Sequence, residues 1–541
     1  MHADVLFSGG TVHTGDPHQP VTDALAVTAG RITALGADAL ALRGERTRLV
    51  DLAGGALLPS WGDGHIHPLL GGIGLRGVPV RDCTSVEEIL QAVRRWAAEH
   101  PEAEWVRGDA FDPWLVEGGL FDARVLDTAV ADRPVLLRTM DHHTGWANSE
   151  ALRRAGFSAD TPDPAHGQIV RRPDGEPLGT LREFGALDPL LSLVPEPDLD
   201  EQVAALAEVT GLLAAAGLTW VQDAWVEHSQ VAAWTAAARS GVLRVRANLA
   251  LLLAPDGWRD RLPALAADRA RVAAEGAGLV TARSVKFFAD GVIESGTAAL
   301  LEPYTDCPHS HGAANWTGEE LAEAVTAVDA LGFQAHIHAI GDHGVRIALD
   351  AVEAAARRNG PRNRRPVLAH LQLVDPADLP RFAALGVTAN FEPLWAQPDE
   401  LMTQLTLPRI GDVRGSRQYQ IAELLRSGAQ VSFGSDWPVT PYEPLPGIAT
   451  AVTRQTPGGV PAGGWLPEQR IGLRDALAAY SAGVAHQAYE EDLWGVLRPG
   501  MRADLVQLAT DPYRVPAADL PAVAVLGTWL GGTRTHGPRT P

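Results

Sequence analysis

The middle of the chain alternates strand-like and helix-like patterns, and this alternation constrains the fold more than any other feature. Short apolar runs, typical of buried parallel strands, are separated by helical patterns that include residues 199–216, 318–331 and 341–357. Repeated βα units of this kind form a parallel sheet or a closed barrel. With the apolar run around Leu57, about eight strands are predicted, the number that a (β/α)8 barrel requires. The other predicted strands lie at residues 218–222, 244–253, 283–288, 333–337, 366–369, 387–391 and 430–433.

Both ends of the chain are rich in short strand patterns. Near the N-terminus, two such runs flank Gly30 like a hairpin, and near the C-terminus two more are followed by a Gly531-Gly532 turn. We therefore expect the termini to pair into one small β-sandwich. The predicted division is 1–55 and 491–541 for the sandwich and 56–490 for the barrel.

Residues 69–197 do not follow the βα rhythm. They are rich in turn sequences yet contain helix and strand patterns, among them a capping box at Ser85 that opens a helix reaching about Glu99. We interpret this segment as an insertion after the first barrel strand, and we expect it to cover the active-site mouth.

Composition excludes several classes of function. The 541-residue chain is 46% hydrophobic and carries a formal net charge of −21, which disfavours binding to nucleic acid or to anionic membranes. Its two cysteines cannot form a disulfide framework. We find no signal peptide and no apolar run of about 20 residues that could span a bilayer. A cytoplasmic, soluble protein is the simplest interpretation, and composition alone does not identify the small-molecule substrate that we expect it to bind.

Several strand-like runs end in residues that bind metals. His65 and His67 are two residues apart, so on a strand they share one face and can converge on one ion. Barrels place their active sites at the carboxyl ends of the strands, and imidazole and carboxylate ligands suit zinc. Taken singly, each residue has an ordinary structural explanation, but the repeated placement favours a metal site. The other candidates at such positions are Lys286, His338, His370 and Asp436.

Two choices stay open on pattern alone. Lys286 lies in an apolar strand, where a snorkelling or ion-paired lysine is the favoured explanation on pattern alone. The alternative is a lysine carbamylated by carbon dioxide, which gives a carboxylate able to bridge two metals. His336 and His338 form a second H-x-H pattern, and their spacing does not distinguish the ligand from a hydrogen-bonded core histidine.

Ordered motifs along nearly the whole chain resemble the amidohydrolase superfamily, and specifically its YtcJ-like branch (amidohydrolase family 3), which includes N-substituted formamide deformylase. One departure is Ser60-Trp61-Gly62-Asp63, which replaces the more usual Gly-Phe/Leu-Val/Ile-Asp. The motifs are GDGHIHP at 62–68, GWANSEAL at 145–152, DTPDP at 160–164, VKFFADGVIESGTAALLEPY at 285–304, HAIGD at 338–342, FGSDWPV at 433–439 and GVLRPGMRADLV at 495–506.

The resemblance implies a barrel with one or two divalent metals, usually zinc, although other divalent metals would fit. It assigns His65 and His67 to the first strand, and it selects His338 over His336 for the fifth. It gives Lys286 to the fourth strand, His370 to the sixth and Asp436 to the eighth. In much of the superfamily the lysine is carbamylated.

The implied reaction is metal-assisted hydrolysis, in which the pKa of bound water falls from about 15.7 toward about 7. Asp436 is expected to orient that water, take its proton and deliver it to the leaving nitrogen. Oxyanion charge is stabilised by the metal with help from a histidine, for which His338 and His370 are the candidates.

The substrate is expected to be an amide-type C–N compound, such as an N-acyl or N-formyl amide with an apolar or aromatic group. His143 and Trp146 in the insertion, and Trp225, Trp395 and Trp437 beyond strand ends, are the candidate substrate contacts, although tryptophan serves equally well in packing.

Other functions remain open on sequence grounds. The same site could hydrolyse an ester, lactone, carbamate or amidine-type bond. A catalytically silent scaffold is disfavoured because all six candidate ligands are present. Relatives often self-associate, so a homodimer is one expectation, although no coiled-coil heptad supports it.

Overall fold

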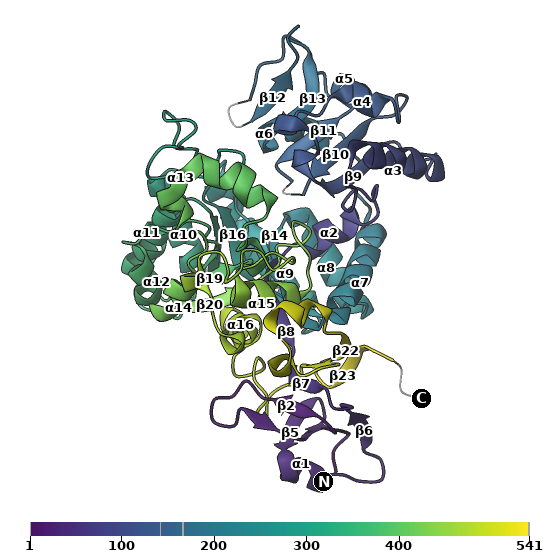
Figure 1. The fold of residues 1–541 in the computed structure, drawn as a ribbon, viewed down its shortest axis with the longest axis vertical. Helices are drawn as coiled ribbons and strands as arrows, with labels where there is room; N and C mark the ends of the chain where they lie inside the picture. The colour runs from purple at the N-terminus through teal and green to yellow at the C-terminus, as the bar shows by residue number, and fades with distance from the viewer. Residues whose placement is uncertain (1, 141, 165–166, 539–541) are drawn as a thin grey trace. The chain divides into compact units, whose positions relative to one another are not determined.

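A computed structural model describes residues 2–140, 142–164 and 167–538, and these fall into two compact units (Figure 1). We call residues 1–67, 206–436 and 442–541 the barrel unit, and residues 68–205 and 437–441 the insertion unit. The barrel unit contains the βα repeats together with the strands from both termini. The insertion unit consists almost entirely of the segment predicted to interrupt the barrel.

Eight parallel strands form the barrel sheet, in the order β20-β19-β18-β17-β16-β15-β14-β8. The first and last strands meet where the Asp436 backbone N–H donates a hydrogen bond to the His65 carbonyl at 2.7 Å. This arrangement confirms the predicted α/β barrel. The strands are β8 (Trp61–Ile66), β14 (Leu218–Val226), β15 (Arg246–Leu252), β16 (Val280–Phe288), β17 (Gln334–Ala339), β18 (Val367–His370), β19 (Thr388–Phe391) and β20 (Gln430–Phe433).

Helices connect the barrel strands, and α10 shows how an amphipathic helix buries one apolar stripe. In α10 the buried residues Leu321, Ala324, Val325 and Val328 recur at the three- and four-residue spacing of one helix face. The longer helices of the barrel unit are α8 (Val231–Ser240), α9 (Trp258–Glu275), α10 (Gly318–Ala330), α11 (Asp342–Asn359), α13 (Leu407–Gly415) and α15 (Pro444–Thr453), and α7 (Leu199–Ala215) begins in the insertion unit and ends in the barrel unit. The shorter ones are α12 (Leu379–Leu385), α14 (Ile421–Arg426), α16 (Leu473–Tyr480) and α17 (Ala482–Gln487).

The prediction that the apolar run around Leu57 is the first barrel strand is wrong. This run forms β7 (Ala56–Pro59), which pairs with terminal strands, and the barrel begins at the next strand, β8. Complete burial of β7 explains its apolar sequence. Apolarity reports burial on both faces of a strand and does not identify the sheet to which the strand belongs.

Strands from both termini build two further sheets in the barrel unit, with orders β5-β4-β1-β6 and β23-β22-β21-β7-β2-β3. One apolar cluster contains side chains from both sheets, including Phe7, Leu57, Leu505 and Trp529. The N-terminal elements are β1 (Val5–Ser8), β2 (Thr11–His13), β3 (Val21–Thr22), β4 (Leu25–Thr28), β5 (Arg31–Leu35), α1 (Gly36–Ala41) and β6 (Arg48–Asp51). The C-terminal strands are β21 (Leu505–Leu508), β22 (Val525–Leu530) and β23 (Thr533–His536).

The insertion unit has its own five-stranded sheet, in the order β12-β13-β11-β10-β9. Its α3 begins at the predicted cap, where the Ser85 hydroxyl accepts a hydrogen bond from the Glu88 N–H at 3.3 Å. That the insertion covers the barrel mouth stays a prediction. Its elements are α2 (Pro68–Gly74), α3 (Val86–Glu99), β9 (Val106–Phe111), α4 (Ala123–Asp127), β10 (Val135–Thr139), β11 (Thr144–Ala147), α5 (Ser149–Arg154), β12 (Gln168–Arg171), β13 (Pro177–Arg182) and α6 (Phe184–Leu191).

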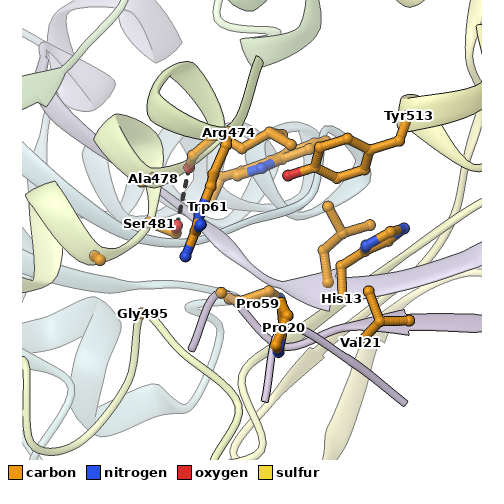
Figure 2. Close-up of a pocket in the computed structure, with 14 residues that line it drawn as sticks. His13, Pro20, Val21, Pro59, Trp61, Arg474, Ala478, Ser481, Gly495 and Tyr513 are labelled. Carbon is orange, nitrogen blue, oxygen red and sulfur yellow. Dashed lines mark hydrogen bonds between the residues drawn. The ribbon is translucent and has the colours of Figure 1, made fainter. Parts of the chain in front are cut away.

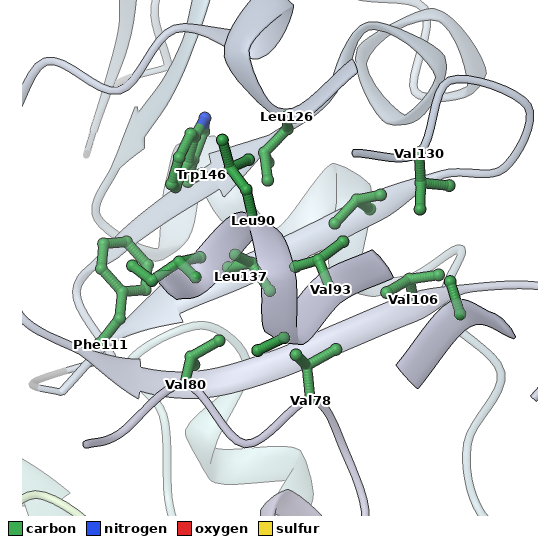
Figure 3. Close-up of a cluster of buried hydrophobic side chains, with 14 of the residues drawn as sticks. Val78, Val80, Leu90, Val93, Val106, Phe111, Leu126, Val130, Leu137 and Trp146 are labelled. Atoms are coloured by element: carbon green, nitrogen blue, oxygen red, sulfur yellow. The ribbon is translucent and has the colours of Figure 1, made fainter. Parts of the chain in front are cut away.

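Figure 3 shows the core of this unit, where α3 packs on the central strands through Leu90 and Val93. None of the helices in the described ranges is long and apolar enough to cross a membrane.

Candidate metal centre

Three of the predicted ligands converge at the seam where the barrel closes. His65 lies near the end of β8, His67 follows that strand, and Asp436 follows β20. One ligand atom from each lies within 4.8 Å of the others, and all three residues are buried. The Asp436 carboxylate is 2.9 Å from Nε2 of His67 and 3.6 Å from Nε2 of His65. These positions allow the three side chains to hold a single cation.

His338 on β17 and His370 on β18 stand beside this trio. Their ring centroids are 4.5 Å apart, and the ring of His370 is 4.6 Å from that of His65. Nε2 of His338 lies 3.2 Å from the carbonyl oxygen of Gly291. The structure therefore brings these two predicted histidines to the same end of the barrel as the first three ligands.

Lys286, on β16, completes the set of six predicted ligands. Its Nζ lies 3.4 Å from Nε2 of His65 and 4.5 Å from the ring centre of Phe288. The side chain is almost completely buried, and this burial lowers the pKa of the ammonium group to about 8. Burial thus makes the neutral amine more accessible than in an exposed lysine, although the ammonium form still predominates at pH 7.

The donor set fits a bound divalent cation. Nε2 of His67 and Oδ1 of Asp436 approach to 2.9 Å without hydrogen-bond geometry, and Oδ1 has no hydrogen-bond partner among the described residues. Burial alone would raise the pKa of Asp436, but contact with His67 and the nearby cationic groups keep it below its usual value. A buried carboxylate oxygen without a hydrogen-bond partner is expected where a cation binds, and mixed nitrogen and oxygen ligands suit zinc.

Two further buried residues, His336 and Glu392, contact two of these histidines. Nε2 of His336 lies 2.9 Å from Nδ1 of His65, and the Glu392 carboxylate lies 2.9 Å from Nδ1 of His370. Each contact leaves Nε2 of the supported histidine as the nitrogen available to a metal. The pattern alone did not decide whether His336 or His338 is a ligand. In the structure His336 contacts the predicted ligand His65.

Glu392 was missed by the sequence analysis. The available signal was its position, because it follows a strand-like run directly, as Asp436 nearly does. Both of its flanking residues are apolar or proline, so nothing near it in the sequence suggests that a histidine from another strand will be its partner.

Asp63 fixes the backbone on both sides of the barrel seam. Its carboxylate accepts hydrogen bonds from the His65 N–H at 3.1 Å and from the Ser435 N–H and hydroxyl at 3.1 and 2.6 Å. Complete burial nevertheless raises the pKa of Asp63 to about 8. The residue thereby connects the segment that carries the two histidines to the segment that carries Asp436.

Aromatic rings surround the cluster within the barrel unit. Trp395 stacks on His370 with centroids 5.4 Å apart and an interplanar angle of 4°. Trp225 lies 6.4 Å from the ring of His67 and 5.2 Å from Phe288. Trp225 and Trp395 thus lie near predicted ligands, while their role as substrate contacts stays a prediction. Phe288 is an additional aromatic neighbour that the sequence analysis did not select.

The other candidate substrate contacts belong to the insertion unit. Trp146 is not a surface contact, because it is 1% exposed, packs in the core with Phe121, and donates its indole N–H to the Asp122 carbonyl at 3.0 Å. The prediction that Trp146 lines a substrate site is therefore corrected. Trp146 has the packing role that the sequence analysis gave as the alternative for tryptophan.

His143 and Trp437 occupy different surroundings. Nδ1 of His143 is 2.8 Å from the Glu183 carboxylate. The ring of Trp437 packs so closely on Gly71 that a Cβ atom at position 71 would overlap it. Both residues keep their predicted role as hypotheses.

Comparison with known proteins gives a consistent result. A model of the amidohydrolase family matches residues 48–536. The protein LONG AFTER FAR-RED 3 of Arabidopsis thaliana is 32% identical, over 99% of this chain and 92% of that protein. The putative amidohydrolase YtcJ of Bacillus subtilis is 28% identical, over 97% and 98% of the two chains. N-substituted formamide deformylase of Arthrobacter pascens is 27% identical, over 98% and 97%.

Solved structures show the same fold. An uncharacterised metal-dependent hydrolase from Pyrococcus horikoshii superposes with a TM-score of 0.75 at 24% identity, covering 95% of this chain and 99% of that one.

Proposed function

This chain belongs to the amidohydrolase family, and from that premise we propose that it is a divalent-metal-dependent hydrolase that cleaves an amide-type C–N bond. The observation that carries the proposal is the buried group of His65, His67 and Asp436, whose ligand atoms lie within 4.8 Å of one another at the barrel seam. The neighbouring His338, His370 and Lys286 enlarge this group to six metal-type side chains.

Zinc is the metal we propose, in one or two copies. His65, His67 and Asp436 would hold the first ion, and His338 and His370 would hold a second. Lys286 would join the two after its neutral Nζ adds to carbon dioxide, which forms a carbamate and releases one proton. A divalent metal supplies Lewis-acid activation of water and of a carbonyl group.

The protein side chains would then direct the proton and the substrate. Asp436, ionised and held beside His67, would accept the proton of the attacking water and return it to the leaving nitrogen. His370, fixed by Glu392, and His338 would stabilise the charge that develops on the carbonyl oxygen. Because these groups are already buried and oriented, little reorganisation is needed during the reaction.

The aromatic surroundings support a substrate with an apolar or aromatic group. Trp225, Phe288 and Trp395 all lie within ring-contact distance of a predicted metal ligand or of each other. The similarity to N-substituted formamide deformylase supports an N-formyl or N-acyl amide.

Hydrolysis of N-benzylformamide by the zinc-supplemented protein tests the proposal, with benzyl formate as the matched ester. We expect Asp436→Asn to retain zinc and to lose about 100-fold or more of kcat, because proton transfer contributes about 10²–10⁴. Asp260→Asn, an exposed change on α9, should behave as wild type. Unchanged kcat in Asp436→Asn would contradict the assignment, and turnover of the ester alone would move the function to ester hydrolysis.

A further inference from the structure

A cavity lies within the barrel unit, at the end of the first barrel strand opposite the metal-type cluster. It has a volume of about 380 Å³ and is bounded by the terminal β-strands, the start of β8 and helices α16 and α17 (Figure 2). Cavities of roughly 300–1,000 Å³ accept drug-sized ligands. Trp61, in its wall, precedes His65 by four residues along β8. At about 3.3 Å per strand residue, this spacing places the cavity wall about 13 Å along the strand from the metal-type cluster.

The cavity is open to solvent on one side and apolar within. Val21 and Tyr513 at its rim are 52% and 46% exposed, whereas Trp61 is 1% exposed. Leu58 and Leu477 also line the space. A flat apolar group that entered here would cover the indole of Trp61 and displace water from these side chains.

Two polar groups of the cavity wall are hydrogen-bond donors of the kind that anions accept from. Arg474 is exposed and lines the space, and among the described residues no carboxylate lies within ion-pair distance of its guanidinium group. The hydroxyl of Tyr513 points into the same space (Figure 2). The hydroxyl of Ser481 is already donated to the Leu477 carbonyl at 2.9 Å, so it does not add a donor.

Asp511, one of the two acids whose charge acts on Tyr513 (the other is Asp475), is already compensated. Asp511 is 2.9 Å from Nε2 of His13, accepts the Tyr513 backbone N–H at 3.0 Å and lies 3.6 Å from Arg514. The ring of His13 in turn packs on Tyr513, with centroids 4.6 Å apart. With Asp511 held by these donors, Arg474 is left as the charge available to a ligand, in a protein whose formal net charge is −21.

We propose that this cavity is a binding site for a small amphipathic organic anion, with a carboxylate or sulfonate at Arg474 and Tyr513 and a flat apolar body against Trp61. The site is separate from the metal-type cluster, and it does not depend on the proposed hydrolysis. Its ligand would connect the terminal strands to the base of the barrel.

Fluorescence titration with two matched probes tests the site on the full-length, zinc-supplemented protein. 8-Anilinonaphthalene-1-sulfonate carries the anion, and N-phenyl-1-naphthylamine has the same rings without it. We expect Arg474→Met to weaken binding of the sulfonate by about ten-fold or more, as the loss of a charge-assisted hydrogen bond predicts, and to leave binding of the neutral probe nearly unchanged. Ala478→Phe, which fills the cavity from α16, should weaken binding of both probes.

Arg261→Met on α9 is the control, because Arg261 is an exposed arginine that does not line the cavity. Equal affinity of the sulfonate for the wild type, Arg474→Met and Arg261→Met would overturn the proposal. Absence of saturable sulfonate binding to the wild-type protein would overturn it as well. Arg474 lies at the surface, so Arg474→Met is expected to fold. The test therefore remains decisive even if Ala478→Phe fails to fold.

Discussion

At the scale of single residues, the histidines of the cluster are held by a second group of buried side chains. His65 is supported by His336 and His370 by Glu392, each through a 2.9 Å contact to Nδ1. Sequence motifs indicated the predicted ligands, because those lie at strand ends with recognisable spacing. The supporting residues could not be found in the same way, since each partner lies on a different strand and the contact exists only after the barrel closes.

This supporting role gives a direct prediction for Glu392→Gln. The amide keeps the size of the side chain but removes the charge that favours the Nδ1–H tautomer of His370. We expect zinc affinity to fall by about 10- to 100-fold, as for other residues that orient metal-bound histidines. Competition with a fluorescent chelator measures this affinity, and Glu319→Gln, on the exposed first turn of α10, is the control. Equal affinities in both variants would show that Glu392 does not orient His370.

At the scale of elements, periodicity predicted the barrel strands well and the sheet membership of one strand wrongly. The predicted run at 430–433 matches β20, and the run at 366–369 is shifted by one residue from β18. Both are short, apolar and bounded by helical patterns, so local sequence is sufficient to identify them. For β7 local sequence was insufficient, because its partners β2 and β21 come from opposite ends of the chain.

The insertion unit shows the same limit for side chains. Trp146 could have faced a ligand or the core, and only the arrangement of β11 against Phe111 and Phe121 decides for the core (Figure 3). We expect Trp146→Ala to destabilise the protein by about 3–5 kcal/mol, the usual cost of removing a buried aromatic side chain. Chemical denaturation measures the loss.

Two further observations make this prediction specific. Leu193→Ala, at a position in the same unit that is 43% exposed, should change stability by much less. The zinc content of folded Trp146→Ala should equal that of the wild type, because all six predicted ligands belong to the barrel unit. If Trp146→Ala is as stable as the wild type, Trp146 becomes a candidate substrate contact again.

At the scale of the whole molecule, the metal-type cluster depends on closure of the barrel. The Asp436 N–H binds the His65 carbonyl at 2.7 Å, and Asp63 accepts from Ser435, although these segments are about 370 residues apart in the chain. The predicted ligands His65, His67 and Asp436 therefore come together only when the barrel closes. The formal net charge of −21 also favours accumulation of cations near the protein.

Metal content is the most direct test of this account. Elemental analysis of the protein purified after expression with zinc should find one or two zinc ions per chain in the wild type. The His65→Ala/His67→Ala variant, which removes two of the three closest ligands, should lose at least one ion. The exposed His18→Ala change should lose none. A wild-type protein without stoichiometric metal, or equal metal content in all three proteins, would contradict the assignment of the cluster as a metal centre.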